Sequence, residues 1–364
     1  MKETELRVGV IGVGKFARGS LIPQLLATGR AKLTAISRPD TVRLEEAQRE
    51  LNASRIFTDW RDLLKQETPD AVIIATSHNT HAEIAIEALK SGAHVFVEKP
   101  MALNANDAWD MVDAAENAGR VLMVGYNSRL STAWQSVKKA LDQGVIGKLR
   151  QLNVVWCING RWLWETDNAP QDLRLAMEKK ESGGDWIKKG SWLTDPGRAG
   201  GGMFVSDACH VIDLIIWLGE APVSRIVAFQ ENAGLSTDCF MTVQAVLVNG
   251  VDVSLVFGAG VDAEPGFFGD GRMSIHGDID ILKADWQGWN PSRDTKVLVT
   301  AKGATSIVEE SSANTPIGSF IETILDGAPN RCSAREAAHT DEFIEGAYKS
   351  AATGQIVDIV KHEA

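Results

Sequence analysis

A lysine in a turn directly after a hydrophobic run is the residue best placed for chemistry. Residues 94–97 read HVFV, and Glu98-Lys99-Pro100 follow them. Strand interiors disfavour proline, so the strand is expected to end here, and a Lys-Pro bond can be cis. A lysine held at a strand end can stabilise negative charge that develops on a substrate oxygen. The plainer alternative is a solvated lysine with no ligand.

A second pattern, far upstream, predicts what lies beside this lysine. The segment Gly12-Val13-Gly14-Lys15-Phe16-Ala17 follows an apolar strand pattern and begins a helix pattern. In a G-x-G-x-x-A fingerprint the first glycine permits the tight turn and the second lets the backbone approach a pyrophosphate. The alanine allows close helix–sheet packing. A tight turn without a ligand is the alternative, but the context favours dinucleotide binding. The expected contacts are Gly12, Gly14, Lys15, Phe16 and Ala17.

The end of the second strand pattern favours NADP over NAD. An NAD site usually places an acidic residue here, where it accepts hydrogen bonds from the adenosine ribose. This chain has Ser37 and Arg38 instead, and a hydroxyl with a guanidinium suits a 2′-phosphate. Asp40 stands nearby but is expected to begin the next helix, and an Arg38 without a ligand is the alternative. We expect NADP as the cofactor, with NAD as the alternative.

Polar residues also follow the fourth strand pattern, and the carboxyl ends of strands in an open α/β sheet face the ligand crevice. Asn79 is alternatively a helix N-cap and His81 an ordinary histidine of a first helical turn. The remaining expected cofactor contacts are Thr76, Ser77, His78, Asn79, His81, Glu98 and Lys99.

The elements that must position these residues alternate regularly over residues 1–125. Expected strands are Leu6–Ile11, Lys32–Ile36, Arg55–Phe57, Ala71–Ala75, His94–Val97 and Val121–Val124. Expected helices are Phe16–Ala27, Thr41–Leu51, Asp59–Lys65, Thr80–Lys90 and Ala105–Asn117. This alternation predicts right-handed βαβ crossovers and a doubly wound parallel sheet, the Rossmann arrangement of an α/β domain.

The pattern changes after residue 125, and residues 126–364 are predicted to form an α+β domain with a largely antiparallel sheet. Expected strands are Arg150–Cys157, Arg225–Phe229, Cys239–Val248, Val251–Phe257, Met273–His276 and Asp280–Ala284. Expected helices are Ser131–Asp142, Asp207–Leu218, Ile317–Asp326 and Ala334–Ala352. The segment Gly160–Arg198 is expected to be a long functional loop.

Composition excludes several classes of partner. A formal charge of −11 repels phosphate backbones and anionic lipid surfaces, so neither nucleic acid nor a membrane is expected as a partner. Four scattered cysteines show no metal-ligand spacing, so no metal is expected either. These thiols, together with an N-terminus that runs straight into a strand, indicate the cytoplasm.

Tryptophan is unusually frequent, with eleven against two tyrosines. Any single tryptophan is more often a core residue, but apolar rings also stack on the C–H faces of sugars. Four lie within about thirty residues of one another, and we expect this segment to form substrate walls. They are Trp162, Trp164, Trp186 and Trp192.

Taken together, these motifs resemble the Gfo/Idh/MocA superfamily of glucose–fructose oxidoreductase, inositol dehydrogenase and rhizopine-catabolism proteins. In the first half the matching segments are GVIGVGKFA (9–17), ATSHNTHAEIAIEALKSGAHVFVEKPMA (75–102) and VLMVGYNSRL (121–130). In the second half they are GVIGKL (144–149), SWLTDPGRAGGGMF (191–204), HVIDLIIWLG (210–219) and EGAYKSAATGQIVDI (345–359). The resemblance implies an N-terminal Rossmann domain and a C-terminal open-faced sheet that carries the substrate and often the oligomer interface. It therefore implies a homo-oligomer, a dimer or a tetramer.

The resemblance also implies that Lys99 and His210 flank a reacting alcohol, with His210 in a D-x-G-x-H-x-x-D motif that ends at Asp213. This chain departs from the motif, because Ser206 stands where many members have the first aspartate. Asp207 is one residue away and would point about 100° aside on a regular helix. Lys99 and His210 must then carry more of the proton handling, for which an imidazole with a pKa near 6.5 is suited.

The sequence thus predicts an oxidoreductase that transfers hydride between a nicotinamide cofactor and a secondary alcohol of a sugar, inositol or related polyol. Arg129 is alternatively part of an interdomain salt bridge. The expected substrate contacts are Lys99, Arg129, Trp162, Trp192, Ser206, Asp207 and His210. Two rivals share the fold, which cannot decide among them. One is an NAD-dependent glycosidase that oxidises its sugar transiently, and the other is a non-catalytic regulator that binds NADP and a sugar.

Overall fold

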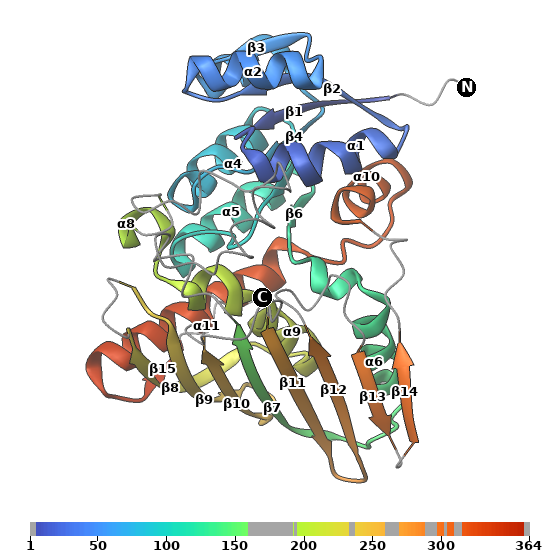
Figure 1. Cartoon of the computed structure of the whole chain (residues 1–364), viewed down its shortest axis with the longest axis vertical. Helices are drawn as coiled ribbons and strands as arrows, with labels where there is room; N and C mark the ends of the chain where they lie inside the picture. Colours follow the sequence, from blue (N-terminus) through green and yellow to red (C-terminus); the bar gives the residue numbers. More distant parts are fainter. Residues whose placement is uncertain are drawn as a thin grey trace, which may run out of the picture. The chain divides into compact units, whose positions relative to one another are not determined.

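The chain folds into two compact units (Figure 1). The computed structural model describes residues 5–158, 192, 195–232, 237–258, 269–287, 297–301, 304–308 and 315–359. Among these, residues 5–126 and 315–338 form the first unit. The described parts of 127–308 and residues 339–359 form the second.

The first unit is built on a parallel sheet of six strands in the order β3-β2-β1-β4-β5-β6. The strands are β1 (Leu6–Ile11), β2 (Ala31–Ser37), β3 (Arg55–Phe57), β4 (Ala71–Ile74), β5 (His94–Val97) and β6 (Leu122–Val124). β1 pairs with both β2 and β4, so the strand order reverses direction at β1, where a doubly wound sheet binds its ligand. The predicted parallel sheet is confirmed.

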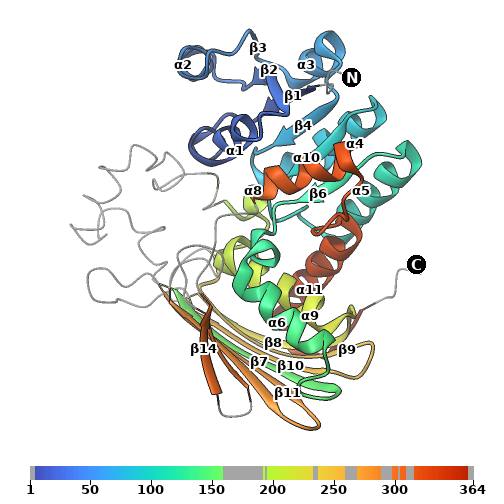
Figure 2. The same cartoon turned by 90° about the vertical axis from the view of Figure 1, so that its right-hand side faces the viewer.

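Helices cover both faces of this sheet, which explains why all four residues of β4 are buried. The helices are η1 (Ala17–Leu21), α1 (Ile22–Ala27), α2 (Thr41–Leu51), α3 (Trp60–Glu67), η2 (His78–Thr80), α4 (His81–Lys90) and α5 (Ala105–Ala118). Figure 2 shows α1 on one side of the strands and α4 with α5 on the other. Asp40 caps α2 by accepting a hydrogen bond from the backbone N–H of Arg43, as expected.

A helix from late in the chain completes the first unit. α10 (Pro316–Asp326) packs against α1 and β5, and its Phe320 ring meets Phe96 edge-on at 5.9 Å between centroids. Arg30 makes two hydrogen bonds of 2.7 Å to the Asp326 carboxylate. Residues 315–338 therefore lie in the first unit, which differs from the boundary expected from the sequence.

The second unit contains a nine-stranded sheet in the order β14-β13-β12-β11-β7-β10-β9-β8-β15. The strands are β7 (Leu149–Ile158), β8 (Val223–Glu231), β9 (Phe240–Leu247), β10 (Asp252–Gly258), β11 (Gly269–Gly277), β12 (Ile281–Gln287), β13 (Val297–Ala301), β14 (Ala304–Val308) and β15 (Val357–Asp358). β7 and β10 run parallel and every other neighbouring pair is antiparallel, so the predicted largely antiparallel sheet is confirmed.

The two faces of this sheet differ in cover. One face packs against helices and includes the fully buried Trp156, whose ring lies 5.5 Å from Phe257 and 6.4 Å from Trp286. The helices of this unit are η3 (Asn127–Leu130), α6 (Thr132–Asp142), α8 (Pro196–Ala199), η8 (Phe204–Ala208), α9 (Cys209–Gly219) and the later part of α11 (Ala334–Thr353). Among the described residues, no helix covers the other face (Figure 2). The expected open-faced sheet is present.

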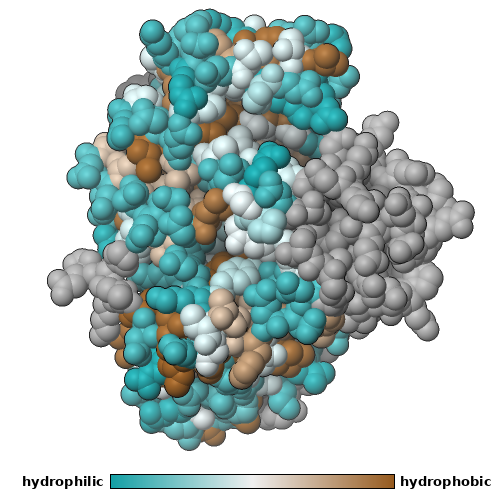
Figure 3. Space-filling model, turned by 90° about the vertical axis from the view of Figure 1, so that its left-hand side faces the viewer, coloured by the Kyte–Doolittle hydropathy of each residue, from teal (hydrophilic) through white to brown (hydrophobic). Residues whose placement is uncertain are grey.

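One helical stretch, Pro196–Gly219, is long and apolar enough to span a membrane, with a mean hydropathy of 1.4 over an 18-residue window. Because 83% of that window is buried inside the protein, the stretch has the character of a core helix. Elsewhere in the described ranges no helix passes this test. In the view of Figure 3 the described surface is mainly hydrophilic, with hydrophobic residues in small separate groups.

Candidate active site

The glycine turn after β1 has the geometry of a nucleotide cradle. Gly12 has φ of +91°, and a Cβ at this position would overlap the carbonyl oxygen of Ala75. Gly14 faces open space, with no atom within 4 Å of the position a Cβ would take. Ala17, 1% exposed, packs inside the unit. The turn therefore leaves room for a group at Gly14 while fixing the backbone at Gly12, which fits a bound pyrophosphate.

The end of β2 lies beside this turn. The backbone N–H of Gly12 donates to the carbonyl of Ser37 at 2.9 Å, and the Arg38 guanidinium reaches the carbonyl of Val13 at 3.4 Å. Ser37 is 2% exposed, whereas Arg38 is partly exposed. The structure therefore places the two residues expected to read the adenosine ribose next to the glycine turn.

The loops after β4 and β5 meet at the same edge of the sheet. The Ser77 hydroxyl donates to Asn79 and the Thr80 hydroxyl to Thr76, so this short loop is tied internally. Asn79 does not cap a helix, because neither η2 nor α4 has a side-chain cap. Both histidines of this segment are buried, His78 at 6% exposed and His81 at 0%.

The turn after β5 begins with a carboxyl group in an unusual environment. The backbone N–H of Glu98 donates to the carbonyl of Ile74 at 2.9 Å, and a cis peptide bond joins Lys99 to Pro100. A Cβ on Gly125 would stand 3.0 Å from the Glu98 carboxylate, so Gly125 makes room for it. Burial raises the pKa of Glu98 to about 7, against the opposing effects of the Lys99 charge and backbone N–H.

This raised pKa predicts a specific dependence of stability on pH. The folded chain binds the Glu98 proton more tightly than the unfolded chain, whose carboxyl has its usual pKa of 4.5. The stability that Glu98 contributes is therefore complete below pH 4.5 and is lost as the pH rises through 7. Glu98→Gln stays neutral, so its unfolding free energy should gain on that of wild type by on the order of 1–3 kcal/mol between pH 4.5 and pH 8.

Urea unfolding of both proteins at the two pH values measures this gain. The control is Glu87→Gln, the same substitution on the exposed surface of α4. A Glu98→Gln difference from wild type that matches that of the control at both pH values contradicts the raised pKa.

In the second unit, the helix that carries His210 is irregular where the expected motif departs. Residues 204–208 form the π-helix η8, and α9 starts at Cys209, so a regular helix does not extend back to Asp207 as predicted. The Ser206 hydroxyl donates to the Asp207 carboxylate at 2.6 Å, which brings the two side chains together. His210 lies in the first turn of α9 and is 4% exposed. π-bulges are frequent at functional sites.

Arg129 and Asp213 form an ion pair within the second unit. The Arg129 Nε and Nη2 atoms donate to the two Asp213 oxygens at 2.8 and 2.7 Å, and both side chains are 1% exposed. The expected interdomain salt bridge is thus an intradomain one.

A buried acid that sequence reasoning missed organises the start of this helix. Asp238, 1% exposed, accepts hydrogen bonds from the backbone N–H groups of Gly202 and Phe204 at 2.7 Å and from the Tyr348 hydroxyl at 2.6 Å. Burial raises the pKa of Asp238 in spite of these bonds. The run of three glycines at 200–202 was the available signal, because such a turn exposes backbone N–H groups that need an acceptor.

Two expected substrate residues have little structural description. Trp162 lies outside the described residues, and Trp192 is partly buried.

Lys99 belongs to the first unit and His210 to the second, so their pairing stays a prediction. Within the described ranges no cluster of three or more possible metal ligands occurs.

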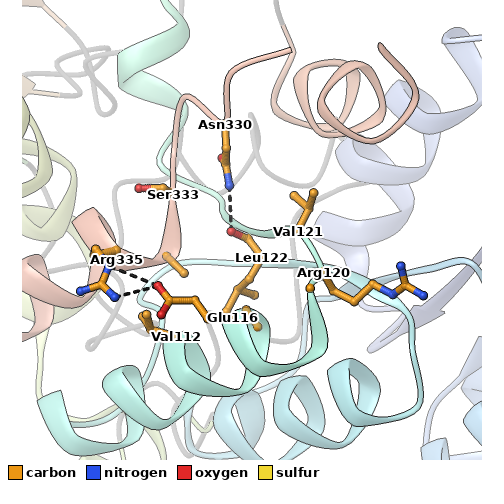
Figure 4. Close-up of a pocket in the computed structure, with 11 residues that line it drawn as sticks. Val112, Glu116, Arg120, Val121, Leu122, Asn330, Ser333 and Arg335 are labelled. Carbon is orange, nitrogen blue, oxygen red and sulfur yellow. Dashed lines mark hydrogen bonds and ion pairs between the residues drawn. The ribbon is translucent and has the colours of Figure 1, made fainter. Parts of the chain in front are cut away.

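A cavity of about 240 Å³ lies elsewhere in the first unit, between the end of α5, the start of β6 and the start of α11 (Figure 4). The Arg335–Glu116 ion pair and a hydrogen bond from Asn330 to the Leu122 carbonyl cross it. Leu122 begins β6, so the cavity adjoins the amino end of this strand, whereas the candidate site adjoins carboxyl ends.

The fold and the strand-end site define a two-unit protein with a dinucleotide-binding Rossmann unit. Residues 6–126 match the family described as "Oxidoreductase family, NAD-binding Rossmann fold", and residues 134–282 match the "GFO/IDH/MocA C-terminal domain". The chain belongs to the GFO/IDH/MocA oxidoreductase family.

Individual relatives agree with this assignment. Myo-inositol 2-dehydrogenase of Thermotoga maritima is 29% identical over 224 residues, which cover 61% of this chain and 58% of the relative. Glycosyl hydrolase family 109 protein 2 of a Shewanella species is 33% identical over 192 residues, covering 50% and 42%. An Agrobacterium radiobacter oxidoreductase, solved with NAD⁺, L-tartaric acid and magnesium, shares the fold with a TM-score of 0.77 at 21% identity, over 98% of each chain. The matches to the two curated relatives span about half of their length.

Proposed function

We propose that this protein is an NAD(P)-dependent oxidoreductase that interconverts a secondary alcohol of a sugar, inositol or related polyol with the ketone. One observation carries the proposal. The open glycine turn after β1, the polar loop after β4 and the Lys99 turn after β5 stand at the carboxyl ends of three neighbouring strands. One edge of the sheet can therefore hold both a cofactor on the glycine turn and a substrate oxygen at Lys99.

The chain's own residues supply the rest of the chemistry. When bound, the nicotinamide accepts or supplies the hydride. The Lys99 ammonium stabilises negative charge on the substrate oxygen, and the His210 imidazole receives or returns the alcohol proton. The Asp207 carboxylate, held by Ser206 one turn before His210, supports the histidine when it is charged. Trp162, Trp192 and Arg129 stay predicted substrate contacts that no observation supports further.

A panel of sugars, inositols and polyols with NADP⁺ and NAD⁺, followed at the absorbance of the reduced nicotinamide, tests this function. We expect turnover of at least one cyclic secondary alcohol. The inositol dehydrogenase relative makes myo-inositol the first compound to assay. No turnover of any compound in either direction would reject the proposal.

NADP is the proposed cofactor because Arg38 lies beside the glycine turn and no carboxylate ends β2. Arg38→Ala should raise the Kd for NADP⁺ about 10- to 100-fold, the effect of losing a hydrogen bond to a charged group, and leave the Kd for NAD⁺ within about threefold. The matched control is Arg43→Ala, because Arg43 is exposed and paired with Asp40. Quenching of protein fluorescence measures each Kd. A wild-type preference for NAD⁺ contradicts the proposal, and so do equal losses for both cofactors.

Two alternatives predict different behaviour. A glycosidase that oxidises its sugar transiently, as the similarity to a glycosyl hydrolase suggests, would retain its cofactor through purification and show no net change in nicotinamide absorbance. A regulator would bind NADP⁺ and a sugar without turnover.

We also propose a cytoplasmic homo-oligomer that buries the open face of the nine-stranded sheet. The strand register aligns Val155, Val256, Thr242 and Phe229 in one row across this face. Its apolar members Val155, Val256 and Phe229 are 47%, 37% and 71% exposed. Val155→Lys should therefore shift the protein towards the monomer in sedimentation, because it places a charge in an apolar interface. The control is Val42→Lys, the same substitution at an exposed valine of α2 in the first unit. An unchanged oligomer in Val155→Lys speaks against this face.

A further inference from the structure

We propose that His81 is a positioning residue that fixes the Lys99 turn to the end of β4, an inference that rests on the proposed role of Lys99. His81 is the first residue of α4, and its side chain is 0% exposed. Its Nδ1 atom lies 2.9 Å from the carbonyl oxygen of Pro100, and its Nε2 atom lies 3.3 Å from that of Thr76. The ring thus stands between the backbones of two strand-end loops.

The proton count of the imidazole decides which loop it bonds. Both neighbours are carbonyl oxygens and only accept, whereas a neutral imidazole has a single N–H to donate. Burial lowers the pKa of His81 to about 4, so the ring is neutral near pH 7. We assign the N–H to Nδ1 because that contact is shorter, so the ring donates to Pro100 and Nε2 faces Thr76 without a proton.

The hydrogen bond between His81 and Pro100 holds the backbone on the C-terminal side of Lys99. Before Lys99, the backbone N–H of Glu98 is bonded to Ile74 of β4. After Lys99, the proline has no N–H to donate, and its carbonyl oxygen accepts the hydrogen bond from His81 Nδ1. The backbone that carries Lys99 is therefore held on both sides, and a displacement of about 1 Å in a reacting group can cost about a hundredfold in rate.

His81 was expected to contact the cofactor, but its surroundings give it a different role. Both of its ring nitrogens face backbone atoms of the protein, and the side chain has no exposed surface. It acts on the cofactor and the substrate only through the turn that it holds.

Three substitutions separate the two ring nitrogens. His81→Asn puts an amide N–H near the position of Nδ1 and should keep kcat within about threefold. His81→Gln puts it near Nε2, and His81→Leu removes it, so both should lower kcat about 10- to 100-fold with little change in KM. If His81→Asn and His81→Leu behave alike, the assigned bond to Pro100 is wrong.

A double-mutant cycle with Lys99→Ala distinguishes positioning from general loss of structure. The measured quantities are kcat with the alcohol that the panel identifies and the Kd for NADPH, which needs no substrate. His81→Leu should impair the protein that has Lys99 and change the Lys99→Ala protein by less than about twofold. Equal effects in both backgrounds, in kcat and in Kd, overturn the inference, and so does the absence of an effect in both.

A matched control lies at the other end of β5, the strand that the Lys99 turn follows. His94 begins β5, is partly buried, and accepts a hydrogen bond from the backbone N–H of Val121 at 2.9 Å. His94→Leu should lower thermal stability as His81→Leu does. Its effect on kcat, however, should be the same in the Lys99→Ala protein as in the protein that has Lys99. Failure of the proposed function would give a different result, because Lys99→Ala by itself would then leave turnover unchanged.

Discussion

Lys99→Ala is expected to lower kcat about a thousandfold, the range found when one group that stabilises charge in a transition state is removed. The reason is local. The turn after β5 places this residue at the carboxyl edge of the sheet, where only β4 separates β5 from β1 and its glycine turn. In the proposed mechanism the ammonium stabilises the oxygen as the alcohol loses its proton, and the methyl group of alanine cannot replace that charge.

The measurement is steady-state turnover of the alcohol found in the panel, together with the Kd for NADP⁺ and the melting temperature. The Kd should rise by less than about tenfold, so that the loss falls on kcat. Lys90→Ala is the matched control, because Lys90 is an exposed lysine at the end of α4 that pairs with Glu87 on its own helix. Undiminished turnover in Lys99→Ala rejects the mechanism, whatever the cofactor proves to be.

Asp213→Ala is expected to lower the unfolding free energy of the second unit by about 3–5 kcal/mol. The substitution leaves the Arg129 guanidinium buried without its carboxylate, and an uncompensated buried charge is costly. The size of this loss comes from the charge that remains. Replacing both partners, as in Arg129→Met with Asp213→Leu, should therefore recover most of the stability.

Urea unfolding followed by tryptophan fluorescence measures these differences, because Trp134, Trp156 and Trp286 are buried in this unit. The control is Asp358→Ala, which breaks the exposed pair with Arg225 and should cost less than about 1 kcal/mol. A loss in Asp213→Ala no larger than that of the control would show that this pair carries little of the unit's stability.

Much of the first unit was predictable because its signals are local. Each strand is a short apolar run, each crossover is short, and the Lys99 turn follows directly from a proline that cannot continue a strand. Cap residues are equally local, which is why Asp40 was expected at the start of α2 and is found there.

The docking of α10 in the first unit was not predictable from its own residues. Its amphipathic pattern shows that one face is buried but not which partner buries it. The contact of Phe320 with Phe96 joins residues far apart in the chain, and no sequence pattern connects them. The short strands β13, β14 and β15 were missed for a related reason, since edge strands draw their order from neighbours that are already in place.

The candidate site was predictable in its residue types and only partly in its geometry. A π-helix leaves no periodic signal, so the contact of Ser206 with Asp207 could not be derived from regular helical angles. The backbone carbonyls that face the His81 ring nitrogens were hidden as well, because any residue type can present a backbone carbonyl.

The glycine turn also limits how this chain can change by mutation. Any single-nucleotide change of a glycine codon that alters the amino acid adds at least a Cβ. At Gly12 that atom would overlap the Ala75 carbonyl, in a backbone conformation that other residues rarely adopt. Every amino-acid substitution that a single-nucleotide change can produce at this position therefore causes the overlap. A library of variants grown under selection for turnover should therefore lose every alternative at residue 12 in its first rounds, whereas alternatives at residue 14, where a Cβ would face open space, should be lost more gradually.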